Sequence, residues 1–168
     1  MNHLKTSFFS RLADPWLLYW LLAITVFVGD QVTKRMVEAR IPFHSRISVV
    51  HGWFDLTYTK NTGAAFGMFS DLPGPWKIFM LIGVSLVLLG LVVFLLVRCR
   101  SLQWKLGVGL SLLLGGAMGN LVDRIRFGHV VDFLDVYFRQ YHWPTFNLAD
   151  SAITVGAGLL IIDSFRSK

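Results

Sequence analysis

Long apolar stretches dominate the chain and predict its main elements. Residues 78–97 carry no charge for twenty positions, the length that a helix needs to cross the hydrocarbon core of a bilayer. Residues 106–122 add a second uncharged run, and residues 16–29 add a third that can continue as helix through Lys34. A fourth run covers residues 151–162. The pattern predicts a membrane protein, mainly α-helical, with four transmembrane helices.

Composition agrees with this class. The chain has 168 residues, of which 54% are hydrophobic and 15% charged, with a mean hydropathy of +0.57, outside the usual soluble range. Lys5 and Arg11 precede the first apolar run as in a secretory signal, but no small-x-small cleavage site follows, so we interpret it as a retained span. We predict one domain over residues 1–168, with spans near 16–37, 76–97, 104–122 and 146–164.

Two segments between the spans have other patterns. Residues 46–50 and 53–59 alternate apolar and polar positions, which predicts two β-strands joined by a turn at His51 and Gly52. We place a small sheet near residues 43–70. Its last part, KNTGAAFGMF, has too many glycines for a regular strand. Such a sheet could rest on the lipid interface, or it could hold an extended peptide by strand addition.

The second segment covers residues 128–142. It is mostly apolar and rich in aromatic residues, but it is too short to span a bilayer. We predict an interfacial helix lying along the membrane surface, with Pro144 marking its end.

Charge suggests an orientation. The chain carries a net charge of +6, which could indicate a nucleic-acid partner. The basic residues are densest, however, in the short segments beside the two termini and between the second and third spans. By the positive-inside rule, both termini lie in the cytoplasm. We therefore attribute the basic residues to topology and anionic lipid, and expect no nucleic acid.

Acidic residues near a span need an explanation, because a carboxylate is costly in the membrane. Asp30 precedes Lys34 by four residues, which predicts a structural ion pair on one helix face. Asp123 follows Asn120 in the quartet NLVD and is next to Arg124, its candidate cation. For both carboxylates a structural role competes with a chemical one.

Asp132 and Asp150 have no lysine or arginine nearby in sequence, and the predicted topology puts both at one membrane face. Two neighbouring carboxylates do not both ionise easily, so one is protonated near neutral pH. This arrangement suits an aspartyl protease, in which one carboxylate activates water and the other carboxyl protonates the carbonyl oxygen. The alternatives are a helix cap for Asp150 and a surface position for Asp132. Asp135 is predicted to face solvent.

Other chemistries have weaker support. Cys99 is the single cysteine, HExxH and GxSxG are absent, and the five histidines lack ligand spacing. We therefore expect no metal and no cofactor. His129 could tune Asp132. Gly115, Gly116 and Gly119 predict close helix packing.

The stretches GDQVTK, KNTGAAFGMF, GGAMGNLVDR, GHVVDF and FNLADSAITVG occur in this order. They closely resemble the motifs of the bacterial lipoprotein signal peptidase (signal peptidase II) family, and the resemblance covers nearly the whole chain. It implies an aspartyl peptidase of the bacterial cytoplasmic membrane with four transmembrane helices, a small periplasmic β-sheet cradle and a periplasmic helix. The implied substrate is a prolipoprotein whose lipobox cysteine carries diacylglycerol, cut just before that cysteine.

Matched by motif, Asp132 and Asp150 are the implied catalytic pair, and no metal takes part. The implied supporting residues are Asn120, Asp123, Arg124, Asn147, Asn61, Asp30 and Lys34. We expect a monomer in contact with membrane lipid, with the site near the periplasmic face. From the topology, the lipid of the substrate would lie among the spans and the β-hairpin would clamp the peptide.

Two rival hypotheses stay open. A small transporter or proton-coupled channel would use Asp30, Asp123 and Asp150 as a relay facing one another in mid-membrane. A peptidase could also pair Asp123, rather than Asp132, with Asp150.

Overall fold

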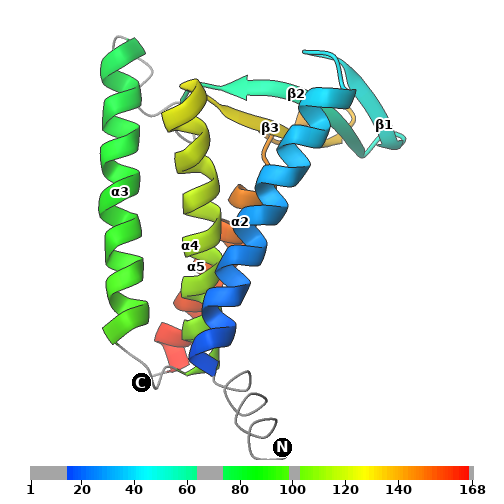
Figure 1. Cartoon of the computed structure of the whole chain (residues 1–168). Helices are drawn as coiled ribbons and strands as arrows, with labels where there is room; N and C mark the ends of the chain where they lie inside the picture. Colours follow the sequence, from blue (N-terminus) through cyan, green and yellow to red (C-terminus); the bar gives the residue numbers. More distant parts are fainter. Residues whose placement is uncertain (1–14, 64–73, 99–102, 167–168) are drawn as a thin grey trace, which may run out of the picture.

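The computed structural model describes residues 15–63, 74–98 and 103–166. These ranges contain four long helices: α2 (Pro15–Arg40), α3 (Gly74–Arg98), α4 (Trp104–Phe127) and α5 (Leu148–Arg166). They also contain four strands: β1 (Arg46–Val50), β2 (Phe54–Asn61), β3 (Val130–Phe138) and β4 (Tyr141–His142). The helices form a bundle, and the sheet lies across one end of it and extends to one side (Figure 1).

α4 is the central helix, since it packs against α2, α3 and α5. Three glycines let the backbones come close, as predicted. A Cβ at Gly115 would lie 2.5 Å from the carbonyl oxygen of Ala23 in α2, and one at Gly116 would lie 2.5 Å from that of Ala149 in α5. A Cβ at Gly119 would overlap the Asp30 carboxylate. Small residues are the usual device for close approach of membrane helices.

The outer surfaces of the other helices are apolar and exposed. All four helices are long and apolar enough to cross a membrane, and α3 is the most apolar, with a mean hydropathy of 3.1. Without lipid, large side chains such as Phe79 and Val87 stay exposed. The predicted fold class is confirmed for its four apolar helices and its small antiparallel sheet.

The strands lie in the order β1-β2-β3-β4, and each neighbouring pair is antiparallel. The β1–β2 connection has the predicted glycine at positive φ, Gly52 at 83°. It holds three residues rather than two, because Trp53 closes the turn by donating to the Val50 carbonyl at 3.0 Å. β2 continues to Asn61, into the stretch KNTGAAFGMF that seemed too broken for a strand. Residues 64–70 of the expected cradle lie outside the described residues.

The predicted interfacial helix over residues 128–142 is wrong. Gly128 ends α4 in the left-handed conformation, with φ 71°, and the chain then forms β3 and β4. β3 pairs with β2 along most of its length, and its first four residues are all buried. A strand covered on both faces has a continuous apolar run, and periodicity cannot distinguish such a run from a short helix.

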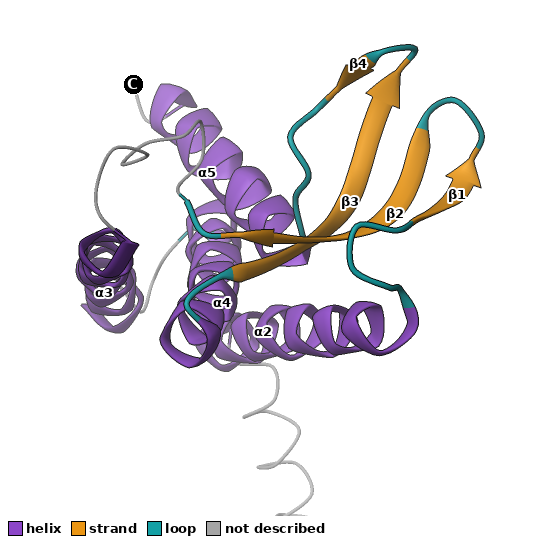
Figure 2. Ribbon diagram, turned by 90° about the horizontal axis from the view of Figure 1, so that it is seen from above, coloured by secondary structure: helices purple, strands orange, loops and turns teal. Residues whose placement is uncertain are grey.

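An apolar core joins the sheet to the bundle. Val37 and Ile41 at the end of α2 pack with Val131 and Phe133 of β3, and all four are buried. Seen from above, α2 lies below the sheet and α3 stands apart from it (Figure 2). The first residues of β3 are therefore held between α2 and the start of α5.

Candidate active site

Asp132 lies in β3 and is 1% exposed. Both carboxylate oxygens accept hydrogen bonds from asparagine amides: Asn147 Nδ2 is 2.7 Å from Oδ1, and Asn61 Nδ2 is 2.9 Å from Oδ2. Thr59 Oγ1 donates to the backbone carbonyl of Asp132 at 3.2 Å. The Asp132 carboxyl is thus buried and oriented by neutral groups.

Asp150 lies in the first turn of α5, three residues after Asn147. Asn147 Oδ1 accepts from the Asp150 backbone N–H at 2.8 Å, and Asp150 Oδ2 accepts from the Asn147 backbone N–H at 3.3 Å. This reciprocal pair is a capping box, so the predicted capping role of Asp150 is confirmed as local structure. The other oxygen, Oδ1, accepts from Asn120 Nδ2 at 2.7 Å. Capping therefore fixes the carboxylate without using both of its oxygens.

Asn147 connects the two carboxyl groups. Its amide nitrogen donates to Asp132, while its backbone and its side-chain oxygen hold Asp150. The side chain is fully buried, at 0% exposure. Asn120 extends the connection: its Nδ2 donates to Asp150, and its Oδ1 lies 3.3 Å from Asn147 Nδ2. The two NLxD quartets of the sequence therefore meet at this point.

A separate ion cluster lies directly behind these asparagines. Lys34 Nζ is 2.8 Å from Asp30 Oδ2, as predicted, and 2.7 Å from Asp123 Oδ2. It also donates to Asn120 Oδ1 at 3.0 Å. The prediction that Arg124 is the cation of Asp123 is wrong, because adjacent helix residues do not face each other. Asp30 also caps α5, since its Oδ1 accepts from the Ala149 N–H at 3.0 Å.

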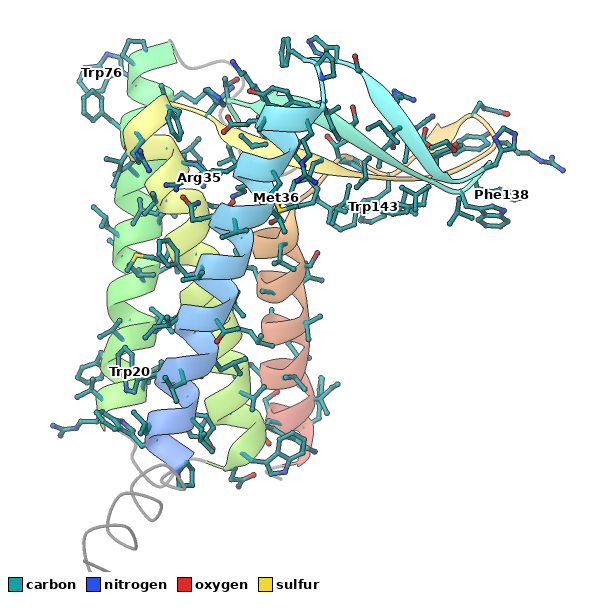
Figure 3. The ribbon with its side chains drawn as sticks, turned by 45° about the vertical axis from the view of Figure 1, so that its right-hand side comes forward. Trp20, Arg35, Met36, Trp76, Phe138 and Trp143 are labelled. Atoms are coloured by element: carbon teal, nitrogen blue, oxygen red, sulfur yellow. The ribbon has the colours of Figure 1, made fainter. Side chains whose placement is uncertain are left out.

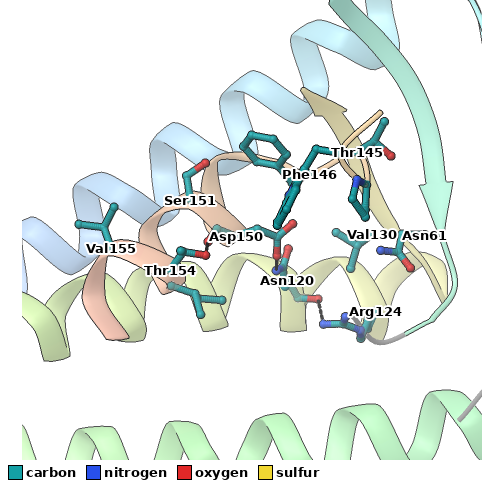
Figure 4. A pocket seen from close by; sticks show the side chains of 13 residues that line it. Asn61, Asn120, Arg124, Val130, Thr145, Phe146, Asp150, Ser151, Thr154 and Val155 are labelled. Atoms are coloured by element: carbon teal, nitrogen blue, oxygen red, sulfur yellow. Dashed lines mark hydrogen bonds between the residues drawn. The ribbon is translucent and has the colours of Figure 1, made fainter. Parts of the chain in front are cut away.

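A cavity of about 820 Å³ opens beside Asp150 (Figure 4). Its lining residues are Asn61, Asn120, Arg124, Val130, Trp143, Pro144, Thr145, Phe146, Asp150, Ser151, Ile153, Thr154 and Val155. The polar groups gather near the starts of α5 and β3, and apolar side chains form much of the remaining wall. Arg124 borders the cavity, and its Nε is buried with no hydrogen-bond partner in the described ranges.

Asp132 itself does not line this cavity, whereas Asn61, its hydrogen-bond partner, does. The Asp132 carboxyl therefore approaches the cavity next to the Asn61 amide. Asn61 ends β2, and its Oδ1 accepts from the Gly63 N–H at 2.9 Å.

The electrostatics distinguish Asp132 from an ordinary carboxyl. Burial, followed by the nearby charge of Asp150, raises the pKa of Asp132 to about 7, against the opposing effects of the Asn61 and Asn147 hydrogen bonds and the Lys34 charge. Water loss penalises the ionised form, and a like charge adds to that penalty. Near neutral pH, a substantial fraction of Asp132 is thus protonated.

The structure brings all nine predicted site residues into one connected network of hydrogen bonds and ion pairs. The sequence reasoning missed Gln31, which donates to Asp123 Oδ1 at 2.8 Å and follows Asp30 directly in GDQVTK. His129 contacts the Phe127 carbonyl rather than Asp132. Asp135 does not face solvent as predicted, since it is 1% exposed. Among the described residues, no group of three or more His, Cys, Asp or Glu side chains could hold a metal ion.

Comparison with known proteins agrees with this geometry. The model of the family described as "Signal peptidase (SPase) II" matches residues 22–166. The chain belongs to the signal peptidase II family. It is 42% identical over 154 residues to the lipoprotein signal peptidase of Syntrophus aciditrophicus, covering 92% of this chain and 96% of the relative. It is 46% identical over 145 residues to that of Nitratidesulfovibrio vulgaris, covering 86% and 87%.

Solved structures resemble the whole fold. A structure described as a bacterial membrane enzyme, determined by the in meso method at 2.3 Å resolution, superposes with a TM-score of 0.78 at 31% identity. The match covers 89% of this chain and 88% of that chain. A second such structure, at 1.9 Å resolution, gives a TM-score of 0.77. The family assignment and the arrangement of helices and sheet therefore agree.

Proposed function

We propose that this protein removes the signal peptide from diacylglyceryl-modified prolipoproteins by an aspartyl mechanism, cutting just before the lipidated cysteine. The relatives of this chain carry the name lipoprotein signal peptidase, and the matches cover most of both sequences. The observation that carries the mechanism is that one buried asparagine, Asn147, holds both Asp132 and Asp150, and that Asp150 lines a largely apolar cavity.

In the proposed reaction, a water lies between the two carboxyl groups. Asp150, ionised, takes a proton from this water as its oxygen attacks the scissile carbonyl carbon. Asp132, neutral, gives its proton to the carbonyl oxygen, which stabilises the tetrahedral intermediate. Collapse of the intermediate breaks the C–N bond as the proton now on Asp150 passes to the leaving amine, and one hydroxyl of the intermediate returns its proton to Asp132, which leaves a carboxylic acid product and the starting enzyme. The raised pKa of Asp132 supports this assignment of the neutral partner.

The surrounding residues have supporting roles in this proposal. Asn120 and Asn147 orient the carboxyl groups by the hydrogen bonds described above. Arg124 and Asn61 border the cavity and present donors to the carbonyl groups of a bound peptide. Asp30, Lys34 and Asp123 hold α2, α4 and α5 together behind the site.

The cavity suits a lipidated substrate. Apolar wall is supplied by Val130, Trp143, Phe146, Ile153 and Val155. An acyl chain gains about 0.8 kcal/mol for each CH₂ buried in such surroundings. The substrate lipid would therefore lie among these residues and the spans, while the peptide crosses between the sheet and the asparagines.

We place the protein in the bacterial inner membrane as a multi-pass monomer. The start of α2 and the end of α5 lie at one end of the bundle, and the sheet and the carboxyl pair lie at the other (Figure 1). The positive-inside rule assigns the first end to the cytoplasm, which puts the active site near the periplasmic face.

The rival hypotheses fit the geometry less well. Asp123 Oδ2 forms an ion pair with Lys34 and Oδ1 accepts a hydrogen bond from Gln31, so both oxygens are engaged in the ion cluster. A relay through Asp30, Asp123 and Asp150 would need titratable groups along the bundle, whereas these carboxylates gather near the sheet end. The pair of Asp132 and Asp150 also fits the position of the cavity, which is lined by Asp150 and by Asn61, the hydrogen-bond partner of Asp132.

The test is cleavage of a purified diacylglyceryl-modified prolipoprotein by wild type, Asp132→Asn, Asp150→Asn and Asp123→Asn, each first shown to fold, with and without EDTA. The proposal expects the first two variants to be inactive, Asp123→Asn to keep measurable activity, and EDTA to have no effect. Activity in Asp132→Asn would show that the wrong partner is named. A wild type that does not cut this substrate would overturn the function.

A further inference from the structure

A second buried polar cluster lies at the far side of the sheet, away from the carboxyl pair. Asp55 of β2 and Asp135 of β3 are direct cross-strand partners, at 7% and 1% exposure. Like charges in this position repel, so they need compensation. His142 Nδ1 lies 2.8 Å from Asp135 Oδ1, and Tyr137 donates to Asp55 Oδ1 at 3.1 Å. Arg46 Nη1 lies 3.5 Å from Asp135 Oδ2.

The β3–β4 hairpin depends on these contacts. β4 has two residues, and the first residue of the turn, Arg139, has a positive φ of 57°, which disfavours a side chain with a Cβ. So short a hairpin is not stable alone. The ring of His142 stacks on that of Tyr137, with centroids 4.7 Å apart and planes at 17°, while its Nδ1 faces Asp135. His142 therefore anchors β4 to β3 by two contacts.

The residues that follow His142 form one wall of the cavity: Trp143, Pro144, Thr145 and Phe146. The distal end of this wall is well held, because the backbone of Phe146 exchanges hydrogen bonds with Phe133 and Leu134. The proximal end has one backbone hydrogen bond, from the Trp143 N–H to the Val136 carbonyl at 2.9 Å, and Pro144 has no N–H to donate. The position of Trp143 therefore depends on where His142 is anchored.

We propose that Asp135 and His142 are positioning residues that set the substrate-binding wall through Trp143, a role that rests on the proposed function. Trp143 is 63% exposed and lies beneath the sheet, whereas Phe138 is at its far end (Figure 3). With His142 anchored, the indole contributes a fixed apolar surface to the cavity. When the anchor is lost, the wall samples other positions and the substrate binds more weakly, while the carboxyl pair keeps its own asparagine supports.

The main test compares wild type with His142→Ala in steady-state cleavage of a diacylglyceryl-modified prolipoprotein. We expect KM to rise about three- to tenfold with kcat within about twofold of wild type, the pattern for lost uniform binding. The conservative variant His142→Asn keeps a nitrogen donor near the Nδ1 position and should restore most of the loss. Tyr141→Ala is the matched control, since Tyr141 is the neighbouring residue of β4 and its side chain is 73% exposed.

A double-mutant cycle separates positioning from a general structural role. If His142 acts through Trp143, His142→Ala should add little to the KM of a Trp143→Ala protein. Fully additive effects, or a fall in kcat as large as the rise in KM, would overturn the proposal.

Hydrogen exchange gives a readout that does not need catalysis. In His142→Ala, the amide of Trp143 should exchange faster than in wild type, while the amides of Leu134 and Asp150 should be unchanged. Unchanged exchange at Trp143 would contradict the proposal even if the protein cleaves its substrate. Faster exchange in a protein whose wild type does not cleave would support the anchor and refute only the function.

Discussion

Two groups of carboxylates, all buried except the half-buried Asp150, lie next to each other in this protein and differ in what surrounds them. Asp30 and Asp123 share the ammonium group of Lys34 at 2.8 and 2.7 Å. Asp132 and Asp150 receive their hydrogen bonds from asparagine side chains and one backbone N–H. The first group is neutralised by direct ion pairing and serves to join helices. In the second group no ion pair forms within the described ranges, and the pKa of Asp132 is raised to about 7, which suits general acid–base chemistry.

The largest effect should come from removing a carboxyl of the second group. Asp132→Asn and Asp150→Asn keep the shape of the side chain and one of its two accepting oxygens but cannot transfer a proton. We expect cleavage to fall by about three orders of magnitude or more, as for residues that act as a unit in other proteases. Both proteins should unfold within a few degrees of wild type. If these variants lose activity because they unfold, the Asp132/Asp150 pair has a structural role like that of Asp30 and Asp123, and the proposed distinction is wrong.

Removing the cation of the first group should instead destabilise the fold. Lys34→Met leaves Asp30 and Asp123 buried without their shared partner, and breaking a buried ion pair costs about 3–5 kcal/mol. Denaturant unfolding in detergent micelles measures this loss. Lys34→Met combined with Asp123→Asn should recover part of the stability, because one of the two unpaired charges is gone. No recovery would mean that the ion pairs are not the source of the stability.

The pH dependence tests the second group more finely. Asp132 has to be neutral to protonate the carbonyl oxygen, and its pKa is raised to about 7. As pH rises through that value Asp132 ionises, so kcat/KM should fall on the alkaline side of about pH 7. A profile that stays flat to pH 9 would contradict a neutral Asp132. Thermal unfolding across the same range shows whether the loss is chemical.

The smallest expected effect concerns Asn61. Its amide donates to Asp132 Oδ2, and this hydrogen bond favours the ionised form and lowers the pKa. Asn61→Ala should therefore move the alkaline limb of the kcat/KM profile to higher pH, by a fraction of a unit to about one unit. Thr59→Ser, which keeps its hydroxyl beside the same strand, is the control and should leave the limb in place. A shift to lower pH would contradict the assigned effect of the Asn61 hydrogen bond.

Local pattern was sufficient for the helices and the first hairpin. Their uncharged runs and the glycine at residue 52 correspond to α2 to α5 and to the β1–β2 turn. The segment after Gly128 was misassigned because the first residues of β3 are buried on both faces of the strand. Such a strand has a continuous apolar run, and hydrophobic periodicity cannot distinguish that run from a short helix. Asp135 was also misplaced, because the prediction that it faces solvent had no knowledge of strand β3. Its burial comes from contacts with Asp55, His142 and Arg46, which no local pattern around Asp135 reveals.

The sequence by itself determined the membrane class and the family, and it named nine candidate site residues, because these inferences depend on local hydropathy and on short motifs. Apart from the Asp30–Lys34 pair, only the tertiary structure decided which carboxylate has which partner. Asp123 lies beside Arg124 in sequence but pairs with Lys34 from another helix, and Asn147 reaches Asp132 across fifteen residues. Charge compensation and burial depend on distances in space, and those distances are set by the close packing of α4 against α2 and α5.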